Sequence, residues 1–564
     1  MPALFKSLCE LLEKVEATKK RLEIINLTAD FIKTLGDQEV EPAVNMMVGR
    51  AFPNYSQKTL DVSWSTLIRV FEHISVFDWG LFRQAMAGTG DIGSATKAVL
   101  EHTKARKQTQ LSQKSLTITE VRTTLDSIAQ VQGSGSRIKK ERLITTLMSQ
   151  AEPIEAKYLV KIFTGEMRTG LHEGLMEQAV ARAFGIILQK VQNAAMVLGD
   201  IGEVAVILKI KGAEGLDTAG FNVFRPVKLM LAQTAQSVKE ALKEHGGKTA
   251  FEYKYDGARV QIHKQNGKVE IFSRRLSDVT TSLPEVVEAV KQNIQAQSAI
   301  VEGEVIALNS AGYPIAFQHL MRRFRRIQNV TDMVAKMPIT LYLFDILYLN
   351  GESLITKPYT QRRIILARIA GKIQLSNQIV TDQPTQAEQF FKEALVAGHE
   401  GLMAKKPISP YTPGRRGKRW LKIKTVLELL DLVITAAEYG YGRRKGWLSD
   451  YYLAARDAST GEFLNIGKTF KGLTDAEIIE LTHQLKRSAI TQDGNRVNVI
   501  PKIVVEVAYN EIQESPRYKS QMALRFARIT RIRDDKSPAE ADTVERVREI
   551  YDRQFRNKGK YSND

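Results

Sequence analysis

Apolar residues in the first two hundred positions recur at intervals of three and four. One such run covers residues 4–15 and another covers residues 159–163. This spacing places apolar side chains on one face of an α-helix. Glycine-containing segments such as residues 88–91 and 133–136 interrupt the runs and are expected to be turns. The pattern predicts a mainly helical N-terminal region.

The pattern changes after residues 212–222, a glycine-containing segment of low periodicity that we expect to be a linker. Short runs of β-branched and aromatic residues then alternate with runs of helical spacing, which indicates an α/β or α+β domain. The predicted strands are residues 249–255, 258–264, 269–273, 300–308, 339–349, 401–406 and 418–424. The predicted helices are residues 284–296, 360–370 and 386–397.

Strands predominate again beyond residue 427, and a small barrel of about five strands is expected there. The predicted elements are strands at 429–438, 450–456, 462–468 and 503–510 and a helix near 474–486. A chain of 564 residues is too long for a single hydrophobic core. We therefore expect three domains, covering residues 1–211, 212–426 and 427–564.

Lysine and arginine outnumber aspartate and glutamate by 81 to 63, which gives a formal net charge of +18. This charge fits a polyanionic partner, whose phosphates the cations would neutralise with release of counterions. The alternative is an ordinary basic protein with solvated faces. Charge alone leaves both interpretations open and does not distinguish DNA from RNA.

The single cysteine, Cys9, excludes an internal disulfide framework and a zinc site built from several cysteines. The eight histidines show no spacing typical of a metal-ligand cluster. No apolar run reaches the length of a membrane span, and the N-terminus is amphipathic rather than signal-like. We therefore expect an intracellular protein without a membrane partner.

The segment most informative about chemistry is Glu252-Tyr-Lys-Tyr-Asp-Gly-Ala-Arg259. Lys254 ends a predicted strand beside the turn signal Asp256-Gly257, so a pocket could hold its side chain rigidly. A lysine nucleophile must lose its proton, and lowering its pKa from about 10.4 to about 7.5 requires roughly 4 kcal/mol of electrostatic bias. We expect neighbouring cations or a metal ion to supply that bias. A plain hairpin with exposed polar residues is the alternative.

The segment also matches the Lys-x-Asp-Gly-x-Arg motif of the covalent nucleotidyltransferases, which are DNA ligases, RNA ligases and mRNA capping enzymes. Segments resembling the other motifs of the superfamily follow in order: Ser273–Arg275, Val301–Val305, Tyr342–Gly351, Glu400–Lys405, Trp420–Lys424 and Ala523–Lys536. Residues 224–232 resemble the entry to a ligase adenylation domain, and residues 164–174 resemble the DNA-binding domain of archaeal and eukaryotic ligases. The resemblance therefore covers nearly the whole chain.

The resemblance implies an ATP-dependent DNA ligase. Its expected domains are an all-α DNA-binding domain, an α+β adenylation domain and a C-terminal OB-fold β-barrel. Lys254 would attack the α-phosphorus of ATP and form a lysyl-AMP. The AMP would pass to the 5′-phosphate at a nick in duplex DNA, and the 3′-hydroxyl would then displace it. Each step is a displacement at phosphorus, in which positioning and charge neutralisation dominate.

The resemblance also assigns the charged groups around the phosphates. Glu304 and Glu400 would hold Mg²⁺ or another hard divalent cation, which prefers carboxylate oxygens. Lys422 and Lys424 alternate along one strand, so both side chains point to the same face, where they would meet the α-phosphate. Their charge would also help to lower the pKa of Lys254.

The remaining assignments concern the nucleoside, the nick and a lid. Phe344 would stack on adenine, and Glu252 would read the adenine amino group. Arg259 and Arg274 would contact the sugar and the nick phosphate, for which a guanidinium fork is suited. Arg525 would lie on a C-terminal domain that closes over the nucleotide. Considered singly, any of these residues could be an ordinary core or surface residue.

Other members of the superfamily fit less well. NAD-dependent ligases carry a four-cysteine zinc site, which one cysteine cannot form. Capping enzymes and RNA ligases lack the long helical N-terminal region. A basic nucleic-acid-binding protein with a dead transferase fold should have lost a motif residue, whereas Lys254, Glu304 and Glu400 are present.

Nicked double-stranded DNA is the expected partner, and the ligase is expected to act as a monomer in the cytoplasm or nucleoid of a prokaryote. A sliding clamp is a further candidate partner, but its docking motif is not evident, because Gln113 in the loop 108–119 is not followed by paired aromatic residues. The sequence does not distinguish replication from repair or recombination.

Overall fold

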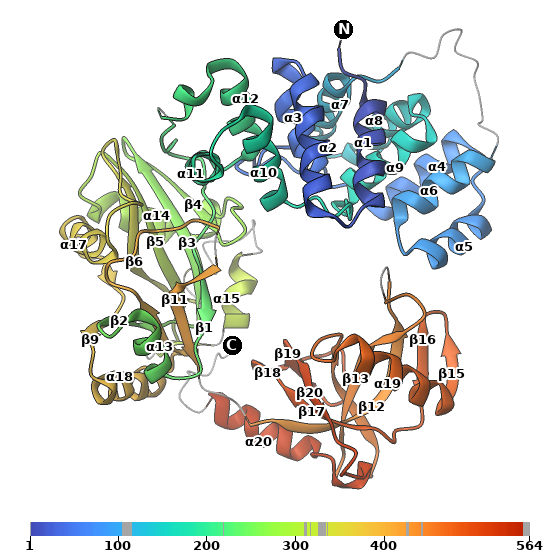
Figure 1. Cartoon of the computed structure of the whole chain (residues 1–564). Helices are drawn as coiled ribbons and strands as arrows, with labels where there is room; N and C mark the ends of the chain where they lie inside the picture. The colour runs from blue at the N-terminus through green and yellow to red at the C-terminus, as the bar shows by residue number, and fades with distance from the viewer. Residues whose placement is uncertain are drawn as a thin grey trace.

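The structure is a computed structural model of the chain (Figure 1). It describes residues 2–103, 115–217, 219–309, 313–315, 317–324, 334, 337–414, 416–424, 428–441 and 444–555. Figure 1 shows a helical region in blue to green, a part with two sheets in green through yellow to orange, and a C-terminal β-rich part in orange to red. Gln113 and most of the loop 108–119 lie outside the described residues.

The helical region contains twelve α-helices in the described residues and one hydrophobic core. Their bounds are α1 Phe5–Ala17, α2 Arg21–Thr34, α3 Asp37–Met47, α4 Trp64–Ile74, α5 Trp79–Thr89, α6 Ile92–His102, α7 Ile118–Gln130, α8 Ser136–Gln150, α9 Pro153–Thr164, α10 Glu173–Phe184, α11 Leu188–Leu198 and α12 Ile201–Lys211. Side-chain caps start several of them, as at Asp91 and Thr117. The helical prediction is confirmed, whereas the expected linker contains a short 3₁₀ helix, η1 (Ala213–Leu216).

The middle part, here called the sheet domain, has two sheets among the residues that the structure describes. The first has the order β1-β11-β10-β2-β9, and the second has the order β4-β3-β5-β6-β7, with β8 beside β6. The strands are β1 Leu231–Thr234, β2 Thr249–Lys254, β3 Ala258–Gln265, β4 Lys268–Ser273, β5 Ser298–Ala307, β6 Ile339–Leu349, β7 Glu352–Ser353, β8 Gln374–Leu375, β9 Gln378–Thr381, β10 Gly401–Lys405 and β11 Arg416–Lys424. The helices are α13 Val238–His245, η2 Thr280–Ser282, α14 Pro284–Asn293, α15 Phe317–Phe324, α17 Tyr359–Ile369 and α18 Pro384–Val396.

The two faces of the first sheet have different surroundings. Phe251, Leu402 and Leu421 point to the face that packs on α13 and α18 in one apolar cluster. Side chains alternate along a strand, so Lys254, Gly401 and Lys424 belong to the opposite face. The sheet therefore has one apolar outer face and one inner face free to carry charged groups.

In its described residues the C-terminal part consists of a main sheet, a separate β18-β19 pair and two α-helices. The elements are β12 Leu430–Tyr439, β13 Leu448–Arg456, β14 Phe463–Thr469, α19 Asp475–Arg487, β15 Ala489–Asp493, β16 Arg496–Val499, β17 Val504–Ala508, β18 Glu511–Glu514, β19 Met522–Arg525, β20 Arg528–Ile532, η4 Pro538–Glu540 and α20 Val544–Phe555. The expectation of about five strands was too low, because the described residues contain nine, six of them no longer than five residues.

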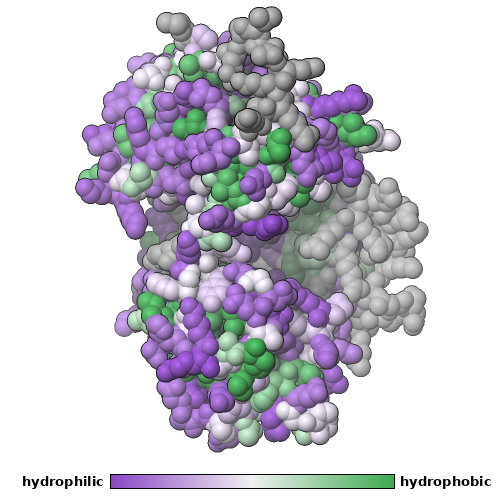
Figure 2. Space-filling view, turned by 90° about the vertical axis from the view of Figure 1, so that its right-hand side faces the viewer, coloured by the Kyte–Doolittle hydropathy of each residue, from purple (hydrophilic) through white to green (hydrophobic). Residues whose placement is uncertain are grey.

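Direct contacts connect the three parts. The side-chain amide of Gln57 donates to Leu276 O at 2.9 Å and accepts from Asp278 N at 2.8 Å. These two hydrogen bonds attach the helical region to the loop after β4 of the sheet domain. Arg525 of the C-terminal part lies over the ring of Phe317 on α15, 5.4 Å from its centroid. Figure 2 shows a mainly hydrophilic face, hollowed between the helical and the C-terminal parts.

No single helix in the described part of the chain is long and apolar enough to cross a membrane. The helices α11 and α12 meet that test only as a pair bent by 118°.

Candidate active site

Lys254 lies at the end of β2, in a row formed by three neighbouring strands. Gly401 on β10 is paired with Lys254 on one side and with Lys424 of β11 on the other. Gly401 has φ +140°, and a Cβ there would lie 2.2 Å from Ile423 O. Only glycine fits this position, and its missing side chain lets the two lysines approach each other.

Glu400, immediately before β10, joins these two lysines. Its backbone N–H donates to Lys254 O at 2.9 Å, which fixes the residue beside the strand end. Its Oε2 lies 2.7 Å from Lys254 Nζ and also contacts Lys424 Nζ. The result is one carboxylate between two ammonium groups.

The charges of this cluster shift one another. Burial by itself would raise the pKa of Glu400, but Lys254 and Lys424 hold it well below its usual value. Burial would lower the pKa of Lys254, yet Glu400, Glu304 and Asp256 together raise it. In this arrangement the pKa of Lys254 is therefore raised, because the adjacent carboxylates outweigh the cations. Burial and Lys254 do lower the pKa of Lys424.

Glu304 and Arg259 lie opposite each other on β5 and β3 of the second sheet. Burial raises the pKa of Glu304 to about 7 despite the opposing effects of Lys254 and Arg259. Since Lys254 and Glu304 influence each other electrostatically, the structure brings the two sheets together at this point. The site is thus formed between the inner faces of both sheets.

Glu302, within the motif Val301–Val305, is fully buried beneath the site. It accepts hydrogen bonds from Arg259 Nη2 and from the hydroxyl of Tyr411, both at 2.8 Å. Arg259 also donates to Met230 O at 2.7 Å. Arg259 donates to the Tyr411 hydroxyl as well, at 3.2 Å, so three partners fix its guanidinium, which suits a group that must contact a ligand in one orientation.

A second buried network surrounds Glu252. Its carboxylate lies 2.7 Å from Lys405 Nζ, accepts from Gln378 Nε2 at 3.0 Å and accepts from the hydroxyl of Tyr359. These internal donors already engage both oxygens of Glu252, so a ligand would meet the whole network rather than a free carboxylate. The ring of Phe344 lies next to it, with Lys405 Nζ 4.5 Å from its centroid.

Two predicted site residues lie away from Lys254. Arg274 is exposed in the turn after β4, close to the residues that form hydrogen bonds with Gln57. Arg525 forms an ion pair with Glu511 at 3.2 Å and contacts α15. Lys422 is partly buried on the inner face, two residues before Lys424.

Sequence reasoning missed several groups that shape the site, namely Tyr359, Gln378 and Tyr411. They come from α17, β9 and the segment before β11, and each reaches the site only through tertiary packing. A signal existed for Lys405, because it closes the Glu400–Lys405 motif and alternation places it on the inner face.

Comparison with known proteins decides the family. The domain families "DNA ligase N terminus", "ATP dependent DNA ligase domain" and "ATP dependent DNA ligase C terminal region" match residues 4–181, 229–424 and 444–536. DNA ligase 1 of Korarchaeum cryptofilum is 46% identical over 555 residues, covering 98% of this chain and 99% of the relative. The chain belongs to the ATP-dependent DNA ligase family.

Other matches agree with that assignment. The DNA ligase of Thermococcus fumicolans is 42% identical over 99% of this ligase and 100% of its own length. The solved structure named "Pmar-Lig_PreS3" superposes with a TM-score of 0.59 at 19% identity, covering 93% of this ligase and 99% of that chain. The expected fold class, with a helical N-terminal region, an α+β adenylation domain and a C-terminal OB-fold, is confirmed.

The residues of the ligase allow a test of the expected metal site. No group of three or more His, Cys, Asp or Glu side chains in the described part of the chain is arranged to hold a metal ion. Glu304 and Glu400 interact electrostatically, and burial disfavours the charged form of Glu304. Mg²⁺ commonly binds through one or two carboxylates together with substrate phosphates. The donor set therefore fits a cation that arrives with the nucleotide.

Proposed function

We propose that this ligase seals nicks in duplex DNA through a covalent AMP on Lys254. The observation that carries the proposal is the position of Lys254 Nζ, held between Glu400, Lys424 and Glu304 where the inner faces of the two sheets meet. This is a rigid strand-end amine surrounded by groups suited to phosphate and metal chemistry. The family's ATP dependence supplies the co-substrate.

The first step requires Lys254 to become a neutral amine. Glu400 now favours the charged form, so the carboxylate must move off Lys254 before attack. A divalent cation held by Glu304 and Glu400 would neutralise phosphate charge and stabilise the leaving pyrophosphate. Once Glu400 is engaged elsewhere, burial and Lys424 both favour the neutral amine. The amine would then attack the α-phosphorus of ATP, which forms the N–P bond and breaks the bond to pyrophosphate.

The nucleoside would lie between the two networks described above. Phe344 offers a ring for stacking on adenine, and the Glu252 network offers polar groups for its amino edge. Arg259, fixed by Glu302, would contact the sugar. Lys422 and Lys424 would contact the α-phosphate.

The later steps need DNA. We assign DNA binding mainly to residues 1–211, adenylation to residues 212–426 and a lid that carries Arg525 to residues 427–564. Arg274 would contact the nick phosphate. The loop that contains Arg274 forms two hydrogen bonds with Gln57 of the helical region. AMP would pass from Lys254 to the 5′-phosphate, and the 3′-hydroxyl would displace it to form the phosphodiester bond.

Finer assignments follow from the same interpretation. We expect a monomer in a prokaryotic cytoplasm or nucleoid, in keeping with archaeal relatives, and Mg²⁺ or another hard divalent cation as the metal cofactor. A sliding-clamp docking motif is not evident in the sequence.

The proposal is tested by incubating the purified ligase with labelled ATP, GTP or NAD and a nicked duplex. ATP should label the protein and support sealing, whereas GTP and NAD should not. Sealing with NAD, or sealing without any labelled protein, would contradict the proposal.

A further inference from the structure

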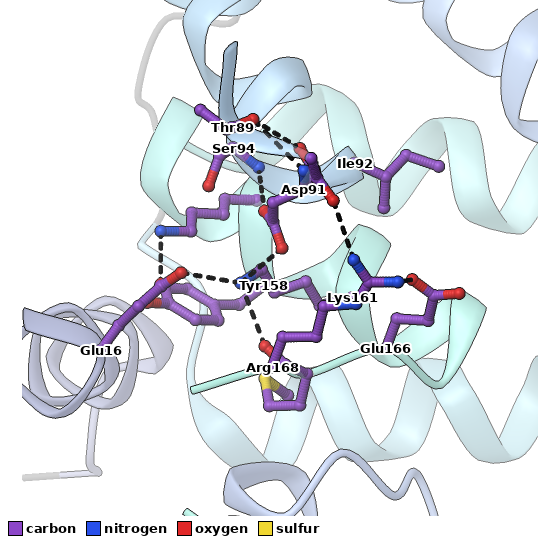
Figure 3. A network of polar contacts seen from close by, with 12 residues as sticks. Glu16, Thr89, Asp91, Ile92, Ser94, Tyr158, Lys161, Glu166 and Arg168 are labelled. Atoms are coloured by element: carbon purple, nitrogen blue, oxygen red, sulfur yellow. Dashed lines mark hydrogen bonds and ion pairs between the residues drawn. The ribbon is translucent and has the colours of Figure 1, made fainter. Parts of the chain in front are cut away.

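A fully buried lysine in the helical region connects two loops. Lys161 lies on α9, and its side chain has no solvent-accessible surface. Its Nζ lies 3.0 Å from Asp91 Oδ2 and 3.3 Å from Glu16 Oε1, and it donates to Met167 O at 3.0 Å (Figure 3). An ammonium group has three donors, so these acceptors saturate it. Asp91 belongs to the loop between α5 and α6, and Met167 belongs to the loop after α9.

A second connection joins the same loops nearer the surface. Arg168 Nη1 donates to Gly90 O at 2.8 Å, and Nη2 lies 2.6 Å from Glu166 Oε2 (Figure 3). The backbone of Arg168 has φ +50° and that of Gly90 has φ +64°, so both loops turn through the left-handed region. The two loops are therefore joined by one buried contact and one partly exposed contact.

Because α6 packs on α9, the position of the loop between α5 and α6 depends on Lys161. A Cβ at Gly93 would lie 2.6 Å from Lys157 O and 2.8 Å from Lys161 Cγ, so α6 lies directly on this part of α9. Asp91 starts α6 by accepting from Ser94 N at 2.6 Å. The carboxylate of Asp91 thus holds the helix start and Lys161 at once.

The surface that the two loops share is suited to a phosphodiester backbone. Its exposed residues are mostly small and include one ion pair, in which the 48% exposed side chain of Arg168 contacts that of Glu166: Gly88, Thr89, Thr164, Gly165, Glu166, Arg168 and Gly170. Small residues allow close approach of a ligand to backbone N–H groups. A completely buried ammonium gives little net stability compared with an apolar side chain of similar size, so its presence calls for another role.

We propose that Lys161 is a positioning residue for nicked DNA, which holds residues 88–91 and 164–170 together as one surface against the phosphodiester backbone. The inference rests on the proposed function, in which the helical region binds DNA. Lys161 itself touches no DNA. It acts by fixing the distance between the two loops.

The chain contains a matched control for this role. Lys157 lies one turn earlier on α9, is also nearly buried, and lies 2.5 Å from Glu13 and 2.7 Å from Glu16. Both partners belong to α1, so its ion pairs stabilise the core without joining the loops. Replacing either lysine by methionine removes a buried cation from the same helix.

The experiment compares Lys161→Met and Lys157→Met in the full-length ligase. Affinity for a fluorescent nicked duplex with a dideoxy 3′ end is measured by anisotropy, and self-adenylation is measured with ATP. Lys161→Met should raise the Kd for the nicked duplex by about tenfold or more, and Lys157→Met should change it by no more than about twofold. The reason is that only Lys161→Met removes the contact that holds the two loops together. Both variants should self-adenylate at the wild-type rate. Amide exchange in residues 88–91 and 164–170 should increase only in Lys161→Met.

Equal affinities for the two variants, or wild-type affinity of Lys161→Met, would overturn the role of Lys161. If Lys161→Met does not fold, Asp91→Asn keeps the cap on Ser94 while removing the charge that faces Lys161. Asp91→Asn should also raise the Kd for nicked DNA, and a wild-type Kd in this variant would overturn the inference. A wild-type ligase that fails to bind nicked DNA would instead contradict the proposed function.

Discussion

The carboxylate of Glu302 offers a quantitative test of how the site is built. Its side chain is completely buried and accepts from Arg259, Tyr411 and Gln261. The substitution Glu302→Ala removes the carboxylate that is hydrogen-bonded to the guanidinium of Arg259, whose side chain is only 17% exposed. It also leaves the hydroxyl of Tyr411 without an acceptor.

The expected cost follows from these contacts. Removing one partner of a buried ion pair typically destabilises a protein by about 3–5 kcal/mol, because the other charge stays buried and unpaired. The sheet domain should therefore lose about that much stability. The KM for ATP should also rise, because Arg259 would no longer be held in one orientation.

Glu304→Ala is the matched control, since Glu304 lies two residues further along β5. Burial raises its pKa to about 7, so removing this carboxyl relieves a disfavoured charge and should change stability by less than about 1 kcal/mol. Stability is best followed by hydrogen exchange of the β3 and β5 amides, because a chain with several domains does not unfold in one transition. A change below about 1 kcal/mol in Glu302→Ala would refute this account of the network.

Two other expectations concern pH and the lid. Burial lowers the pKa of His263 to about 3, so below pH 6.5 the unfolded chain binds a proton that the folded chain does not. The stabilisation should be complete above pH 6.5 and fall by up to about 4 kcal/mol towards pH 3. Hydrogen exchange of the β3 amides should show a shallower pH dependence of this stability in His263→Gln, and identical slopes would count against this. Arg525→Ala should slow self-adenylation by roughly 100-fold and should slow sealing of a pre-adenylated nick much less. Quenched-flow assays measure both rates, and equal decreases in the two rates would argue against a lid role.

The elements of the sheet domain were predicted well because their patterns are local. Residues 339–349 coincide with β6, and 249–255 differ from β2 by one residue. Strands β7 and β8 were missed, since each has only two residues and no periodicity to detect. The prediction also missed strands of four or five residues, which are too short to show a clear alternation, namely β1, β9, β15, β16, β18, β19 and β20.

The site was predictable as a set of residues but not as an arrangement. Alternation correctly placed Lys422 and Lys424 on one face. The row of Lys254, Gly401 and Lys424 depends on the register between distant strands, which tertiary packing sets. For that reason the sequence indicated cations around Lys254 but not the contact with Glu400 that raises its pKa.

The central claim is that Lys254 becomes covalently adenylated, and intact mass spectrometry followed by peptide mapping tests it most directly. Ligase incubated with ATP and Mg²⁺ should gain the mass of one AMP, the modified peptide should contain Lys254, and Lys254→Ala should gain nothing. Absence of the added mass in active wild-type protein, or its appearance on another residue, would contradict the account.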